Sequence, residues 1–341
     1  MGPTMDQISR KDFILGAGLA AGAAWMETGS RVAAGVTAAE EPTFAERLGW
    51  PKGSRVLMIH ADDAGMSKGS NDAIIETIQA GTVTSASVMM TCSWVPGYMR
   101  WIEDHSDVCT GVHLVFTSEW DDYRWSPVLG QDTVPGLLDK WGRLPDSVAE
   151  VVASATADEV EAEMRAQIEF AERIGMKVSH IDSHMGTLFA TPQYFERFIK
   201  VAIDTQIPML IAGGHMTQAA SDNPQAAALL KPLVPTIWNN GLPVLDDIDT
   251  RSYSWKSTDK IVEFSQMVRD LKPGITWFNV HPTIPSDEAK HITNDRELLW
   301  GDYYTLVNPE MKKVIEQEGV ILTSWVEIME RRKAVGDSLD L

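Results

Sequence analysis

Aspartate and histidine residues directly follow an apolar run near the start of the sequence. Residues 56–59 are apolar and lead into His60, Asp62 and Asp63. A buried strand that ends in adjacent carboxylates places them at the carboxyl edge of a parallel sheet, where α/β proteins build their sites. Two neighbouring aspartates are costly to ionise together, and a metal ion bound to one of them leaves the other free as a base. The alternative is that both aspartates cap the following helix, since aspartate is a favoured cap residue.

Other predicted strands also end in residues that can bind a metal ion. These residues are His113, His180, Asp182, His184 and His281. Two or three histidines with one aspartate, and one coordination position left open for water, form a typical ligand set of catalytic zinc. A metal ion held in this way activates water and polarises a carbonyl group, as the hydrolysis of an amide or ester requires.

Each histidine also has an explanation without a metal ion. A lone histidine in an apolar strand, such as His113, is usually a buried residue with satisfied hydrogen bonds. His180 and His184 have the spacing of a helical pair, although the nearby Ser183 and Gly186 favour a turn at a strand end. The metal site is the better interpretation because these alternatives would all have to hold at once. The remaining histidines are interpreted as structural or surface residues, namely His60, His105, His215 and His291.

Predicted strands and helices alternate along the chain and would position these residues. The predicted strands are 56–59, 85–90, 108–115, 178–181, 208–212, 275–280 and 320–322. The predicted helices are 71–80, 96–104, 158–174, 192–205, 225–230, 258–271, 309–318 and 325–333. This order predicts an α/β fold with a parallel sheet that is closed or nearly closed into a barrel, with a flat doubly wound sheet as the alternative.

A long segment, residues 117–144, separates the third predicted strand from the next helix. Segments of this length inside a compact domain are usually functional or disordered. Trp120, Trp125 and Trp141 argue against disorder, because aromatic residues are scarce in disordered segments. We therefore expect an ordered loop whose tryptophans either stack on a ligand or pack into the core.

Composition limits the classes of function. The chain has 341 residues, and 44% are hydrophobic and 23% charged, as in ordinary globular proteins. The net charge of -19 repels phosphate backbones and excludes nucleic acid as an expected partner. Cys92 and Cys109 are too few for a disulfide framework or a cysteine-rich zinc module, and both are predicted to be buried.

Residues 1–40 have the features of an export signal. Arg10 and Lys11 precede an apolar run of small residues from 14 to 25, which is too short for a membrane span. The arrangement around Ser9 and Phe13 is similar to a twin-arginine signal in which Lys11 replaces the second arginine. The prediction is therefore an exported protein, periplasmic or extracellular, with a single catalytic domain at 41–341. An N-terminal amphipathic helix that stays on the protein is the alternative.

Five motifs together resemble the YdjC-like carbohydrate deacetylases. They are HADDAGMSKGSNDAI, GTVTSASVM, TGVHLVFT, HIDSH and VHP, in this order between residues 60 and 282. The resemblance implies an irregular (β/α) barrel similar to polysaccharide deacetylases, and a divalent metal ion, zinc or magnesium. The chain differs from the family in having no histidine between Met185 and Pro192, and no arginine after residues 208–212.

The resemblance also implies a role for each site residue. Asp63, His113 and His184 would bind the metal ion, Asp62 would be the general base, and His281 the general acid. His180 and Asp182 would lie behind them and orient the ligands or the base. Related enzymes often pair, so a homodimer is an expectation.

The resulting hypothesis is an exported, metal-dependent enzyme that removes acetyl groups from N-acetylated sugars. Water on the metal ion is deprotonated by Asp62 and attacks the acetamide, and His281 protonates the departing nitrogen. Two alternatives remain, a carbohydrate-binding protein with this fold and no turnover, and a metal-dependent hydrolase of another amide or ester.

Overall fold

The computed structural model describes residues 41–222 and 230–336. The predicted export signal, 1–40, and most of the predicted helix 225–230 lie outside the described residues. Within the described part, seven strands form one parallel sheet in the order β4-β3-β2-β1-β6-β5, and β7 pairs with β1. The strands are β1 Arg55–Ala64, β2 Ser85–Val88, β3 Thr110–Leu114, β4 Ile181–Ser183, β5 Asp247–Asp249, β6 Gly274–Val280 and β7 Ile321–Leu322.

The sheet curls, and the segment 209–212 links its two edge strands. Met209 forms a single parallel bridge to Ile181 of β4, and Ala212 forms one to Leu245, just before β5. The backbone N–H of Leu245 also donates to the carbonyl of Ile211 at 3.0 Å. The predicted irregular barrel is confirmed. The predicted strand 208–212 contributes only these isolated bridges, so the barrel is least regular there.

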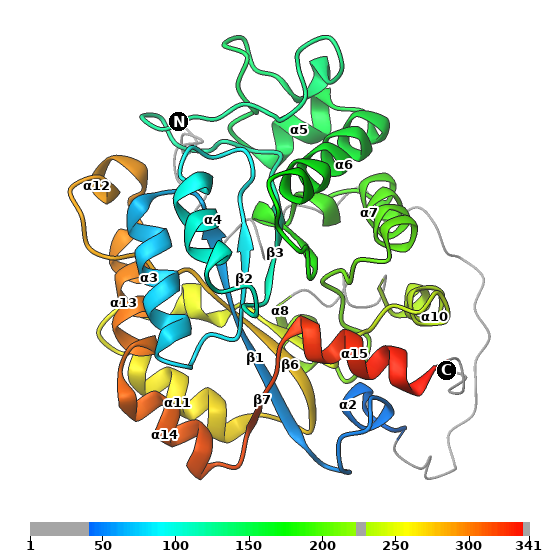
Figure 1. Cartoon of the computed structure of the whole chain (residues 1–341), viewed down its shortest axis with the longest axis vertical. Coiled ribbons are helices and arrows are strands. Elements are labelled where there is room, and N and C mark those ends of the chain that lie inside the picture. Colours follow the sequence, from blue (N-terminus) through cyan, green and yellow to red (C-terminus); the bar gives the residue numbers. More distant parts are fainter. Residues whose placement is uncertain (1–40, 223–229, 337–341) are drawn as a thin grey trace, which may run out of the picture.

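Helices surround the sheet (Figure 1). In this view α3, α11, α13 and α14 lie on one side of the sheet, and α6, α7, α10 and α15 on the other. The longer helices are α3 Lys68–Gln79, α4 Val95–Glu103, α6 Ala157–Arg173, α7 Pro192–Thr205, α11 Lys260–Asp270, α13 Arg296–Leu306, α14 Pro309–Gln317 and α15 Trp325–Val335. The shorter ones are α2 Phe44–Arg47, α5 Val148–Ser154, α8 Thr217–Asp222, α10 Val234–Asn239, α12 Ala289–Ile292, η1 Pro135–Leu137, η2 His184–Phe189, η3 Lys231–Leu233 and η4 Arg251–Ser254.

Local sequence signals explain where the helices begin. The Thr156 hydroxyl accepts from the N–H of Glu159, whose carboxylate accepts from the N–H of Thr156, a capping box that starts α6. Helix α7 begins at Pro192 after a Thr191 cap, as predicted. Among the described residues, no helix has both the length and the apolar character that a membrane span needs.

The structure also contains short helices that were not predicted, namely α2, α5, α8, α10 and α12, and three further differences have a local explanation. Strand β4 spans 181–183 instead of the predicted 178–181, and its pairing with β3 begins at Ile181, opposite Val112. Strand β5 was not predicted, since it has only three residues, Asp-Ile-Asp, and buries its two aspartates more than its isoleucine. Helix α13 was missed because its buried face includes Gly301, Asp302 and Thr305, so it shows no apolar periodicity.

Candidate metal centre

The carboxyl ends of four strands of the sheet bring the predicted site residues together. Asp62 and Asp63 lie near the end of β1 and His113 lies in β3. His184 is the first residue of η2, directly after β4, and His281 directly follows β6. All five side chains are buried. Strand β1 is flanked by β2 and β6, so its aspartates occupy the middle of this edge.

The backbone of β1 is distorted where it carries Asp63. The register against β2 shifts between Ala61 and Ala64, which marks an irregularity of the bulge type. Asp63 has a φ of 68°, a left-handed conformation that is uncommon for residues other than glycine. Such strain persists where the surrounding structure imposes it, and it is concentrated at functional sites. A regular strand would place two adjacent carboxylates on opposite faces. Here Asp62 Oδ2 and Asp63 Oδ1 lie 3.8 Å and 3.5 Å from the same atom, His113 Nε2.

Three donor atoms form a small triangle. Asp63 Oδ1 lies 3.5 Å from His113 Nε2 and 3.6 Å from His184 Nδ1, and the two nitrogens are 3.1 Å apart. The ligands of a tetrahedral zinc ion at about 2.1 Å are separated by roughly 3.4 Å. The spacing of these atoms therefore suits a divalent ion.

A carboxylate contacts the other nitrogen of each imidazole. His113 Nδ1 lies 2.7 Å from Asp182 Oδ1, and His184 Nε2 lies 3.0 Å from Glu119 Oε1. Such contacts fix the tautomer of a metal-binding histidine and turn its second nitrogen towards the ion. The two inward nitrogens lie 3.1 Å apart, close enough to share a proton or to bind one cation together. The donor set therefore fits a bound metal ion.

Protons compete for the same nitrogens. Burial opposes protonation of His184, but the charge of Glu119 and hydrogen bonds to Asp63 and Glu119 outweigh it and raise its pKa to about 9. Burial likewise opposes protonation of His113, yet Asp62 and Asp182 raise its pKa. A metal ion that binds here must displace these protons.

Asp62 lies beside the triangle, with partners on both oxygens. Its Oδ2 accepts from the amide of Asn279 at 3.0 Å and lies 3.4 Å from His281 Nε2. Its Oδ1 lies 3.0 Å from His60 Nε2. Burial opposes ionisation of Asp62, but the charge of His113 and the hydrogen bonds from His281 and His60 hold its pKa well below the usual range. Asp62 is therefore ionised, as a group must be before it can accept a proton.

His60 is part of this network, although the sequence interpretation left it as a structural residue. Its Nε2 lies 2.9 Å from Asp182 Oδ2, and its Nδ1 lies 2.8 Å from the Ser85 hydroxyl. Burial opposes protonation of His60, but the hydrogen bonds and charges of Asp182 and Asp62 raise its pKa to about 9. The sequence held a usable signal, because His60 and Asp62 are two residues apart and so share a face of β1.

His180 lies further back than the other predicted residues. Its Nε2 is 3.7 Å from Asp182 Oδ2, and its ring stacks on Trp325 with centroids 5.4 Å apart. Asp182 itself contacts both His113 and His60. Asp182 thus touches the triangle directly, whereas His180 lies behind it and packs edge-on against the ring of His60, with centroids 4.9 Å apart.

His281 is held by a second buried charge pair. Its backbone N–H donates to Asp302 Oδ2 at 3.0 Å, and Lys260 Nζ lies 2.5 Å from Asp302 Oδ1. The ring of Tyr253 packs against its imidazole with centroids 4.4 Å apart. These contacts leave Nε2 of His281 directed at Asp62.

The segment 117–144 is ordered and contributes a residue that the sequence analysis missed. Glu119 contacts His184, but it lies four residues beyond the predicted strand 108–115 and outside the recognised motifs. Of the three tryptophans, Trp125 is buried with its ring centroid 6.4 Å from that of His184, Trp120 is half-buried, and Trp141 is 74% exposed. The segment is anchored on α6, where Glu163 accepts the N–H of Val128 at 2.7 Å.

Comparisons with known proteins agree over most of the chain. A "Carbohydrate deacetylase" of Thermus thermophilus is 27% identical over 276 residues, which cover 80% of this chain and 93% of the relative. A "Carbohydrate deacetylase" of Brevibacillus brevis is 35% identical over 153 residues, covering 45% of this chain and 58% of the relative. The crystal structure of an Enterococcus faecalis protein, a candidate for cellobiose-phosphate cleavage, shares the fold with a TM-score of 0.65 and 21% identity, over 80% of this chain and 98% of that one.

The family assignment rests on the sequence profile of the YdjC-like proteins, which matches residues 56–317. This range begins in β1, includes each of the strand ends that form the triangle, and continues through α14. The chain therefore belongs to the YdjC-like protein family.

Proposed function

We propose that this YdjC-like protein is a metal-dependent hydrolase that removes acetyl groups from N-acetylated sugars. The observation that carries the proposal is the triangle of Asp63, His113 and His184 with Asp62 and His281 beside it. A site that only bound sugars would have no need of two proton-handling groups next to a metal-binding triangle. The relatives named carbohydrate deacetylases support the choice of an acetylated sugar over other amides and esters.

Asp63, His113 and His184 would hold the divalent ion. Zinc and magnesium both remain candidates, and two imidazole ligands favour zinc because magnesium prefers oxygen. A divalent ion in this position supplies a Lewis acid and lowers the pKa of a bound water. Asp182 and Glu119 keep the two imidazoles oriented from behind.

Asp62 and His281 would move the protons. Asp62 is ionised and accepts the proton of the attacking water, while Asn279 fixes its orientation at 3.0 Å. His281 Nε2 lies 3.4 Å from Asp62 Oδ2, so both groups reach the same reacting centre. His281 gives its proton to the amine nitrogen as the bond to the acetyl carbon breaks, which yields acetate and the free amino sugar.

The substrate and the location form part of the same proposal. We propose that residues 1–40 direct export and that 41–341 form one catalytic domain, which acts on glycans outside the cytoplasm. The charged start and apolar run of the first 25 residues support it. A homodimer is proposed as the assembled form, and its test is the mass of the purified mature chain in solution.

Acetate release tests the activity. The mature chain is incubated with N-acetylglucosamine and its oligomers as purified, after treatment with a chelator, and after zinc or magnesium is added back. We expect release that stops with the chelator and returns with one of the metals. Folded, metal-loaded protein that releases no acetate from any acetylated glycan would contradict the proposal and favour a binding protein.

A further inference from the structure

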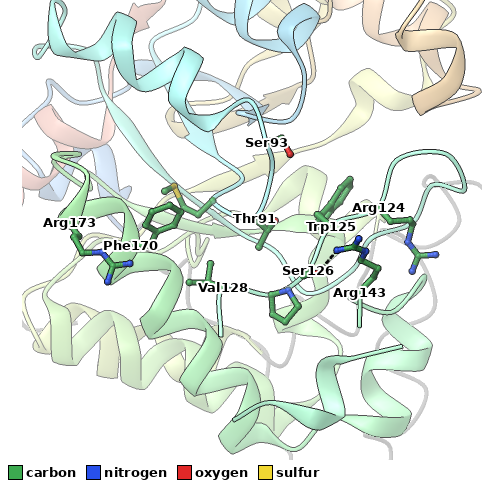
Figure 2. A pocket seen from close by; sticks show the side chains of 11 residues that line it. Thr91, Ser93, Arg124, Trp125, Ser126, Val128, Arg143, Phe170 and Arg173 are labelled. Atoms are coloured by element: carbon green, nitrogen blue, oxygen red, sulfur yellow. Dashed lines mark hydrogen bonds between the residues drawn. The ribbon is translucent and has the colours of Figure 1, made fainter. Parts of the chain in front are cut away.

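The protein has a pocket of about 570 Å³ that is lined by residues of three segments (Figure 2). Its walls come from the loop after β2, from residues 124–128 and 143 of the long segment, and from the end of α6. Trp125 connects the pocket with the metal centre, because it lines the pocket and its ring lies 6.4 Å from that of His184. This volume is within the range of pockets that hold small ligands.

The charge of this pocket is opposite to that of the chain. The chain carries 48 acidic and 29 basic residues. Among the described residues that line the pocket there are three arginines, Arg124, Arg143 and Arg173, and no aspartate or glutamate. Figure 2 shows Arg173 at one end and Arg124 and Arg143 at the other.

Two of these arginines form no ion pair within the described part of the chain. Arg124 is neutralised by Asp139, at 3.2 Å, and by Asp146. Arg143 instead donates to the Ser126 hydroxyl at 2.8 Å. Arg173 lies over the ring of Phe170, with its guanidinium carbon 5.5 Å from the centroid. Two guanidinium groups at the pocket are therefore available to an anionic ligand.

The turn that carries Arg143 is closed by hydrogen bonds and also presents an exposed aromatic ring. Asp139 Oδ1 accepts the backbone N–H of Trp141 at 2.7 Å and that of Arg143 at 2.9 Å. The indole of Trp141 is 74% exposed, and Lys140 Nζ lies 5.2 Å from its ring centroid. An exposed aromatic ring two residues from Arg143 suits a ligand that has both apolar sugar faces and negative charge.

We propose that this pocket binds a carboxylate-bearing sugar unit of the glycan, adjacent to the acetylated unit at the metal centre. Guanidinium groups pair with carboxylates through two parallel hydrogen bonds, which makes arginine the preferred residue for this recognition. The inference rests on the proposed deacetylase function and narrows its substrate class to acidic glycans. In such glycans, N-acetylated sugars alternate with carboxylate-bearing sugars or carry a carboxylate themselves.

The test compares two substrates of equal length. One is the N-acetylglucosamine tetramer, and the other is a tetrasaccharide of alternating N-acetylglucosamine and glucuronic acid. For zinc-loaded mature protein at low salt, we expect kcat/KM to be at least tenfold higher for the acidic substrate, mainly through KM. The advantage falls as salt screens the arginines.

Variants assign the preference to the pocket. In the Arg143→Gln/Arg173→Gln double variant, the ratio of acidic to neutral kcat/KM falls at least tenfold. The control variant, Lys52→Gln/Arg100→Gln, loses the same charge from exposed positions outside the pocket and keeps the wild-type ratio. Equal use of both substrates by the wild type, or an unchanged ratio in the pocket variant, overturns the inference.

Binding separates this inference from the deacetylase proposal. Calorimetry with metal-free protein measures the affinity for the acidic tetrasaccharide and for N-acetylglucosamine 6-phosphate without any turnover. Tight binding of the acidic tetrasaccharide that is lost in the pocket variant supports the inference even if no acetate is released. Binding of only the phosphorylated sugar overturns it in favour of a phosphate site.

Discussion

His113 Nε2 and His184 Nδ1 face each other across 3.1 Å, and a carboxylate holds the far nitrogen of each ring. The pair comes from β3 and from the start of η2, which are separated by about seventy residues of sequence. Neither histidine alone would indicate a metal ion. Their convergence at Asp63 makes the arrangement specific, and it leads to the predictions below.

Zinc should stabilise the folded protein, because the triangle that binds it is assembled only in the native state. A melting curve of metal-free protein with and without added zinc measures the effect. We expect a rise in Tm of several degrees at a zinc concentration about 100-fold above Kd. The His113→Ala/His184→Ala variant should show no rise. A wild-type Tm that does not respond to zinc would contradict the metal site.

Asp62→Asn should lower kcat by roughly 100-fold or more, because the amide cannot accept a proton from the attacking water. Zinc content should stay near that of the wild type, since Asp62 lies outside the triangle. Steady-state acetate release and metal analysis of the same preparation check both parts. Wild-type turnover in this variant would remove Asp62 from the role of base.

Glu119→Gln should weaken metal binding about 10- to 100-fold, because His184 loses the carboxylate that orients it. A competition titration with a zinc chelator measures the affinity. Asp121→Asn is the matched control, since Asp121 is an exposed carboxylate two residues along the same segment. Equal affinities of the two variants would show that Glu119 does not act on the metal ligands.

The stability of the metal-free protein should fall between neutral and alkaline pH because of His60. The pKa of His60 is raised in the folded state from 6.5 to about 9 by Asp182 and Asp62, against the effect of burial. The protonated ring therefore contributes stability that is complete below about pH 6.5 and is lost as the pH rises through about 9. NMR titration of the imidazole gives the pKa, and urea unfolding at pH 7 and pH 10 gives the stability. A ring that titrates near 6.5 would refute this account.

Local patterns predicted the barrel and the grouping of the site. The apolar run before Asp62 and Asp63 indicated a buried strand, and strand ends of a parallel sheet meet at one edge, so His113, His184 and His281 could be grouped with them. Glu119 could not be predicted, because a long loop has no periodicity and its position depends on anchors such as Glu163 in α6. Spacing puts His60 on the same face of β1 as Asp62, but it does not reveal the contact of His60 with Asp182, which joins two strands.

The left-handed backbone at Asp63 has a consequence for how this protein can vary. Holding a residue other than glycine in that conformation costs about 1 to 3 kcal/mol, so Asp63→Gly would remove strain from the fold and a carboxylate from the triangle together. Selection for stability alone would favour glycine at this position, and selection for activity would oppose it. If variants of this protein were selected for stability alone, Asp63→Gly would be favoured although it inactivates the enzyme. Activity would have to be screened in the same round to avoid this outcome.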